Sequence, residues 1–178
     1  MTASARAGVS EAEFLSLPES VQRIELVDGE VIMSPSPSFW HQEVLARLVV
    51  ELRAWAAART PPPSVVQAPL DVKLGSDRIV QPDAVVFLDP LPRDVSGPIT
   101  RIPDLCVEVL SSNRSYDRIT KRFLYAEAGV REYWIVDPAG HVERRCGDGL
   151  ARVELCETQL RSGLLPEFIL DVAALLGA

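Results

Sequence analysis

The chain has 178 residues, of which 47% are apolar and 24% charged, and this length and composition are typical of one globular domain, residues 1–178, with a substantial core. No apolar run approaches the ~20 residues of a membrane span and the N-terminus lacks an apolar secretory signal, so we expect a cytoplasmic protein with no membrane partner. The formal net charge of −7 argues against unspecific adhesion to nucleic acid, although carboxylates that hold metal ions would themselves add negative charge.

The first 33 residues predict a frayed start, a short helix and a hairpin. Residues 1–9 are expected to be frayed, and Ser10 with Glu13 forms a capping-box signature for a helix that ends near Pro18. Residues 23–33 predict a hairpin whose turn is Asp28–Gly29. Glu25 lies in its first strand, where we expect an outward-facing residue of an edge hairpin; the other interpretation is that it faces an acidic cleft.

A helix is predicted over about residues 39–59, after a turn-rich connector. Leu45, Leu48, Leu52 and Trp55 share one stripe of this helix, and the position one turn before Leu45 is His41. His41 therefore points inward, either as a hydrogen-bonded core residue or as part of a site.

Two strands over residues 65–74 and 79–88 predict a second hairpin, joined at Gly75-Ser76-Asp77. The first alternates apolar and polar side chains, so one of its faces is expected to be solvated. The second is apolar on both faces, as in a central strand, yet contains Pro82 and Asp83. Asp83 is therefore an unexplained carboxylate in a predicted core.

Residues 103–138 predict a strand, a helix and a second strand. The apolar strand 105–110 contains Glu108, and the helix over about 115–128 places Asp117, Lys121 and Tyr125 four residues apart on one face. Only two of the 18 basic residues are lysines. A lysine at position 121 is therefore either the result of sequence drift or a compact ammonium that can position or deprotonate a small nucleophile.

The remaining chain predicts a polar hairpin over 141–156 and an apolar tail with a short helix. We assign no chemistry to it. Cys146 and Cys156 are expected to be packing residues or cross-strand neighbours.

Asp83, Glu108 and Lys121 are the residues that indicate chemistry. Two buried carboxylates repel one another unless a cation lies between them. A divalent ion would satisfy them, and oxygen ligands select Mg²⁺ or Mn²⁺, which activates water and offsets charge on a phosphoryl group.

Pro82-Asp83, then Glu108-Val109-Leu110, then Lys121 is similar to the PD-(D/E)XK nuclease superfamily. The third place of the E-x-K element is Leu110 instead of lysine, and in this superfamily the lysine can migrate to the neighbouring helix. Nearly all of the chain after residue 10 resembles the Uma-type putative restriction endonuclease family, in which a lysine at the position of Lys121 takes this role. Its most specific run is D-x-x-x-K-x-x-x-Y-x-x-x-G-V-x-E-Y-W, which begins at Asp117.

The resemblance implies an α/β (α+β) fold with a restriction-endonuclease-like core, a mixed β-sheet flanked by helices, an N-terminal hairpin and a C-terminal β-hairpin extension. It implies a metal-dependent endonuclease that hydrolyses DNA phosphodiester bonds, with Asp83, Glu108 and the backbone carbonyl of Val109 holding Mg²⁺ or Mn²⁺. The catalytic residues would be Asp83, Glu108 and Lys121. Auxiliary candidates are His41, Glu25, Asp117 and Tyr125. DNA is the implied partner. Whether the protein forms a homodimer is left open.

Two rivals remain. One is a nuclease-fold protein that has lost useful catalysis and acts as a binding or scaffold module, which the displaced lysine favours. The other is a zinc or thiol enzyme, which has little support because two histidines and three cysteines show no ligand spacing.

Overall fold

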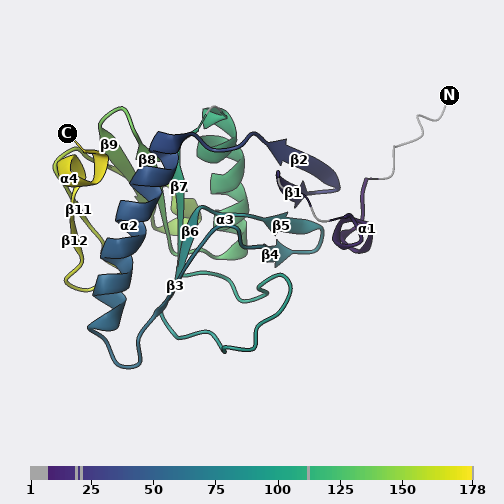
Figure 1. Cartoon of the computed structure of the whole chain (residues 1–178), viewed down its shortest axis with the longest axis horizontal. Coiled ribbons are helices and arrows are strands. Elements are labelled where there is room, and N and C mark those ends of the chain that lie inside the picture. The colour runs from purple at the N-terminus through teal and green to yellow at the C-terminus, as the bar shows by residue number, and fades with distance from the viewer. Residues whose placement is uncertain (1–7, 19, 21, 112, 178) are drawn as a thin grey trace.

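The computed structural model describes residues 8–18, 20, 22–111 and 113–177. In these residues the strands form a six-stranded sheet in the order β10-β9-β8-β7-β6-β3, a four-stranded sheet in the order β2-β1-β5-β4, and a two-stranded sheet of β11 and β12. Figure 1 shows the four-stranded sheet on one side of the molecule and β11, β12 and α4 on the other.

The large sheet is mixed, because β7 and β8 are parallel and every other neighbouring pair is antiparallel. Its strands are β3 (Ser64–Gln67), β6 (Ala84–Phe87), β7 (Leu105–Val109), β8 (Glu132–Asp137), β9 (His141–Cys146) and β10 (Arg152–Cys156). The small sheet consists of β1 (Arg23–Val27), β2 (Glu30–Ser34), β4 (Val72–Gly75) and β5 (Arg78–Val80). The last pair is β11 (Gln159–Arg161) and β12 (Ile169–Asp171).

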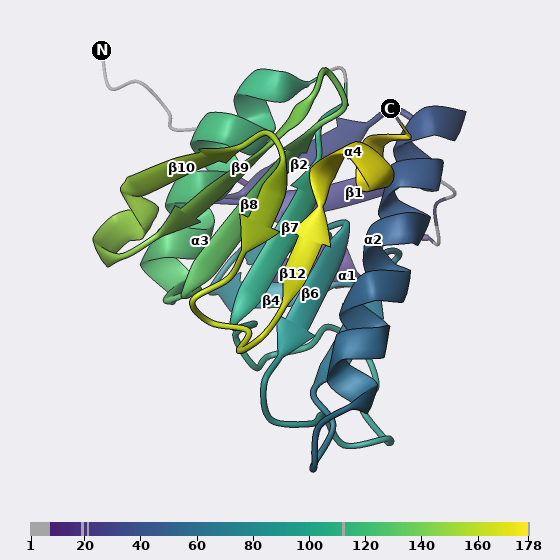
Figure 2. The ribbon, with the colours of Figure 1, turned by 90° about the vertical axis from the view of Figure 1, so that its left-hand side faces the viewer.

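Helices cover both faces of the large sheet. α2 (Phe39–Ala57) and α4 (Val172–Leu176) lie on one face, and a π-helix η1 (Tyr116–Lys121), continued by α3 (Arg122–Ala128), lies on the other. A 3₁₀ turn η2 (Asp148–Leu150) follows β9, and α1 (Glu11–Leu15) packs against the small sheet through Phe14. Leu48 and Leu52 of α2 pack on the face that carries Val107 and Val109, whereas Tyr125 of α3 packs on the face that carries Cys106. Figure 2 shows α2 and the β12–α4 segment side by side on one face of the sheet, with α3 behind it. The expected mixed sheet flanked by helices is thus confirmed.

Several local predictions are confirmed. Ser10 and Glu13 form the capping box of α1, and β1 pairs with β2 through Asp28 and Gly29, which both have positive φ, as a type I′ turn requires. Residues 1–7 of the segment expected to be frayed lie outside the described residues. Val9, also in that segment, donates a hydrogen bond to the carbonyl of Gly29.

The two long strands predicted over 65–74 and 79–88 are wrong as continuous elements. Each is divided between two sheets: β3 and β6 pair in the large sheet, while β4 and β5 pair in the small one. The second strand is interrupted at Gln81-Pro82-Asp83. Proline has no N–H to give to a strand ladder, so this break lets the chain leave one sheet and enter the other.

The C-terminal hairpin of β9 and β10 is confirmed. Cys146 lies opposite Arg152 and Cys156 opposite Val142, so the two cysteines are not a cross-strand pair. Both are buried free thiols and act as packing residues. Among the described residues, no helix is long and apolar enough to cross a bilayer.

Candidate active site

Asp83 lies at the break before β6 and is buried. Its Oδ1 is 2.6 Å from Arg23 Nη2, and its Oδ2 is 3.1 Å from His41 Nε2 and accepts the amide N–H of Val109 at 2.8 Å. Burial alone would raise the pKa of Asp83, but the hydrogen bond with His41 and the positive charge of Arg23 outweigh it and lower the pKa to about 2. Asp83 is therefore an ionised carboxylate held from three sides.

Glu108 lies near the end of β7, on the face covered by η1 and α3. Its Oε1 accepts hydrogen bonds from Lys121 Nζ at 2.7 Å and from the Tyr125 hydroxyl at 2.6 Å. Burial raises the pKa of Glu108 to about 8, against the opposing effect of the Lys121 charge, and the negative charge of Asp83 adds to the increase. A metal ion that binds this carboxyl group at neutral pH would therefore have to displace a proton.

Glu25 was expected to face outward, and this prediction is wrong. Its side chain is fully buried, and Oε1 lies 3.0 Å from Lys121 Nζ and accepts the amide N–H of Gln81 at 2.6 Å. Since β1 pairs with β5 on one side and β2 on the other, it is an interior strand of its sheet and not an edge. The alternative interpretation, in which Glu25 faces the cleft of Glu108, is the one that the geometry matches.

Lys121 bridges the two sheets. Its ammonium, with a side chain that is 1% exposed, contacts Glu25 from the small sheet and Glu108 from the large sheet. Burial lowers the pKa of Lys121, but the charges of Glu108 and Glu25 more than compensate and raise it, so the ammonium stays protonated. Lys121 ends the π-helix η1, a helical form that is rare and frequently found at functional sites.

Arg23 joins the two central carboxylates and was not among the residues predicted from the sequence. Its Nη2 contacts Asp83 as above, and its Nη1 lies 3.9 Å from Glu108 Oε2. The available signal was spacing: Arg23 and Glu25 are two residues apart on one strand, so their side chains share a face. Once Glu25 points inward, Arg23 does too.

These side chains line a cavity of about 480 Å³ between the two sheets and the start of α2. Its wall includes Asp83 and Lys121, together with Arg23, His41, Gln81, Asn113, Tyr116 and Asp117. Burial raises the pKa of Asp117 to about 6, with the Lys121 charge acting in the opposite direction. Glu108 does not line the cavity itself, whereas Arg23 and Lys121, which contact it, do.

The structure thus brings together every residue predicted for the site. Arg23 contacts both Asp83 and Glu108. Asp83 also contacts His41 and the amide of Val109. Glu108 also contacts Lys121 and Tyr125, and Lys121 in turn contacts Glu25. In the described part of the chain, no three or more His, Cys, Asp and Glu side chains are grouped as metal ligands. Asp83 Oδ1 and Glu108 Oε2 nevertheless face one guanidinium, so this donor pair suits a hard cation that takes the place of Arg23.

Comparisons with known proteins bear on the family and the fold. The profile of the Uma2 family, described as "Putative restriction endonuclease", matches residues 11–173. The fold is similar to the crystal structure of a putative nuclease belonging to DUF820 from Anabaena variabilis ATCC 29413, with a TM-score of 0.79 and 22% sequence identity over 95% of this chain and 98% of that one. No curated protein matches the chain.

Proposed function

Because the chain belongs to the Uma2 family of putative restriction endonucleases, we propose that it is a divalent-metal-dependent endonuclease that hydrolyses phosphodiester bonds of DNA. The observation that supports this most is the convergence of Asp83, Glu108 and Lys121, from three separate elements, beside one open cavity. Two carboxylates can hold a divalent ion that activates water, and a nearby ammonium can offset negative charge that develops during hydrolysis.

Asp83, Glu108 and the backbone carbonyl of Val109 would hold Mg²⁺ or Mn²⁺. When bound, the ion supplies an activated water and offsets charge on the phosphoryl group. Other residues of the chain orient these two carboxylates. His41 and the Val109 amide fix the orientation of Asp83, and Tyr125 fixes that of Glu108.

Lys121 would position the attacking water and donate hydrogen bonds to developing negative charge. Glu25 supports this role, because it contacts the ammonium together with Glu108 and keeps it protonated. Asp117, on the same cavity wall, has a pKa raised to about 6 and can exchange protons near neutral pH.

A second candidate function is a nuclease-fold protein that binds its partner without cleaving it. One observation favours it: Arg23 and Lys121 already contact the carboxyl groups of Asp83 and Glu108, so the fold provides partners for both without a metal ion. In this alternative Arg23 stays in place and the cavity serves only for binding.

Plasmid cleavage separates the two functions. We expect purified protein to nick or linearise supercoiled plasmid in Mg²⁺ or Mn²⁺, to lose this activity in EDTA, and to lose at least about 100-fold in the variant Asp83→Asn, which keeps the side-chain volume. Asp89→Asn, a change of the same chemistry at an exposed residue, should cleave like the parent. Parent protein that binds DNA and does not cleave it would favour the binding function, whereas equal cleavage by Asp83→Asn would show that the cleavage does not come from this site.

A further inference from the structure

The outward face of α2 carries a stripe of six residues, none of which belongs to the buried core. Its members are Phe39, Glu43, Ala46, Val50, Arg53 and Ala57, spaced by four, three, four, three and four residues. The opposite face of α2, with Leu45, Leu48 and Leu52, forms the core. Among the exposed large hydrophobic side chains of the described residues, the two most exposed are Phe39 (77%) and Val50 (64%), and both lie on this stripe.

The spacing of the stripe is that of the a and d positions of a coiled coil. When two such helices pack antiparallel, each a position lies in one layer with a d position of the partner. Applied to two copies of α2, this rule pairs Phe39 with Ala57, Glu43 with Arg53, and Ala46 with Val50. The largest side chain meets a small one, and the two charges on the stripe are opposite, so the stripe is complementary to itself.

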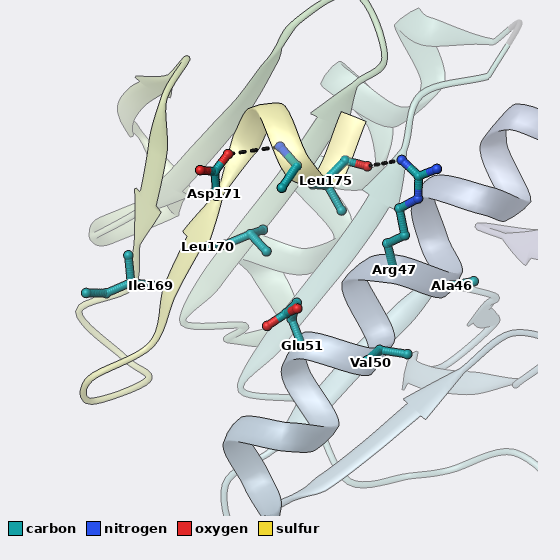
Figure 3. Close-up of a pocket in the computed structure, with 9 residues that line it drawn as sticks. Ala46, Arg47, Val50, Glu51, Ile169, Leu170, Asp171 and Leu175 are labelled. Atoms are coloured by element: carbon teal, nitrogen blue, oxygen red, sulfur yellow. Dashed lines mark hydrogen bonds between the residues drawn. The ribbon is translucent and has the colours of Figure 1, made fainter. Parts of the chain in front are cut away.

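A groove lies beside the stripe. It has a volume of about 500 Å³ and is lined by α2, including Ala46 and Val50 of the stripe, and by the β12–α4 segment. Figure 3 shows Arg47 and Glu51 on the side of α2 that faces this segment, with Ala46 and Val50 pointing away from it. Arg47, at the upper end of the groove, turns toward the carbonyl of Leu175, to which it donates a hydrogen bond of 3.3 Å. Ile169 is 46% exposed, so the β12 side of the groove presents apolar surface.

We propose that a second copy of this chain docks here, with the two α2 helices antiparallel about a two-fold axis near Ala46 and Val50. An interface of this kind is isologous, because the same surface serves both subunits. None of the six stripe residues lines the cavity of the candidate active site, so these residues leave that cavity open in each subunit of the dimer. The N-termini of the two helices, where His41 contacts Asp83, lie at opposite ends of the pair, roughly 27 Å apart for a 19-residue helix.

Charge reversal tests the interface and its register. We expect the parent protein to be a dimer by sedimentation equilibrium, and Glu43→Arg or Arg53→Glu alone to raise the dimer dissociation constant at least about tenfold, because each places like charges opposite one another twice. The double variant Glu43→Arg/Arg53→Glu restores the opposite pairing and should restore the dimer. Arg and Glu have similar helix propensities, and the partly exposed ion pair that Glu43 makes with Arg47 contributes little to stability, so α2 itself should stay intact in each variant.

Matched controls are Glu30→Arg and Arg152→Glu, which make the same charge changes at exposed positions outside α2 and should leave the dimer unchanged. Each of three results would overturn the proposed interface: a parent protein that is monomeric, a dimer dissociation constant that neither single reversal changes, or a double variant that stays monomeric. None of these results depends on nuclease activity, so this inference stands or falls separately from the proposed function.

Discussion

Arg23 and Asp83, sixty residues apart in the chain, meet with 2.6 Å between Nη2 and Oδ1 inside the candidate active site. The same guanidinium faces Glu108, so it occupies the place between two carboxylates that a metal ion would need. Arg23 therefore stabilises the folded protein through Asp83 and, at the proposed metal site, would compete with the ion.

Arg23→Gln tests this competition. Without metal, we expect the free energy of unfolding to fall by about 2 kcal/mol, because a buried carboxylate loses a charged partner. Affinity for Mn²⁺, measured by calorimetry without DNA, should rise several-fold, because the competing cation is gone. Arg131→Gln removes an exposed ion pair with Asp104 and should change neither quantity much. Unchanged or weaker Mn²⁺ binding by Arg23→Gln would show that Arg23 does not compete.

Lys121→Arg tests the lysine. We expect DNA cleavage to fall sharply, because a planar guanidinium replaces a compact donor and cannot fit the same contacts with Glu25 and Glu108. Because Lys121 is buried, the larger side chain should also lower the melting temperature, so cleavage is measured well below it. Tyr125→Phe removes the other donor to Glu108 and leaves the ammonium, and it should retain more activity. Parental cleavage rates in Lys121→Arg would rule out the proposed role.

Divalent metal should stabilise the folded protein. At a concentration about 100-fold above the dissociation constant, Mg²⁺ or Mn²⁺ should raise the melting temperature by roughly 5–10 °C, because the ion binds only the folded arrangement of the carboxylates. Asp83→Asn should abolish this shift, whereas Asp89→Asn should preserve it. A melting temperature that is insensitive to millimolar metal would count against the site.

Metal affinity should increase with pH. The pKa of Glu108 is raised to about 8, so at pH 6.5 this carboxyl group holds a proton that the metal must displace. Affinity for Mg²⁺ should therefore rise by up to about tenfold per pH unit below 8 and level off above it. Asp83 contributes nothing in this range, because its pKa is about 2. Calorimetry in buffers of different ionisation enthalpy would detect the released proton, and affinity independent of pH would contradict the assignment.

The sequence alone determined the part of the site that depends on local geometry. Glu108, Lys121 and Tyr125 lie within 18 consecutive residues on one strand and the helix after it, and helical spacing was enough to place Lys121 and Tyr125 on the face that meets Glu108. His41 was placed inward for the same reason, by the apolar stripe of its own helix. Periodicity is a property of a single element, so it can be read without knowing what the element packs against.

Only the tertiary structure decided how the two sheets meet, and this brought Glu25 and Arg23 into the site. Alternation along β1 gives two faces but does not say which is buried, and that depends on β5, about fifty residues away, pairing with its free edge. The same long-range pairing required the break at Pro82, which took Asp83 out of a strand and turned it toward Arg23 and His41. Strand pairing depends on contacts between distant segments, whereas helix faces depend on neighbours in sequence, and this is why the lysine could be predicted and the arginine could not.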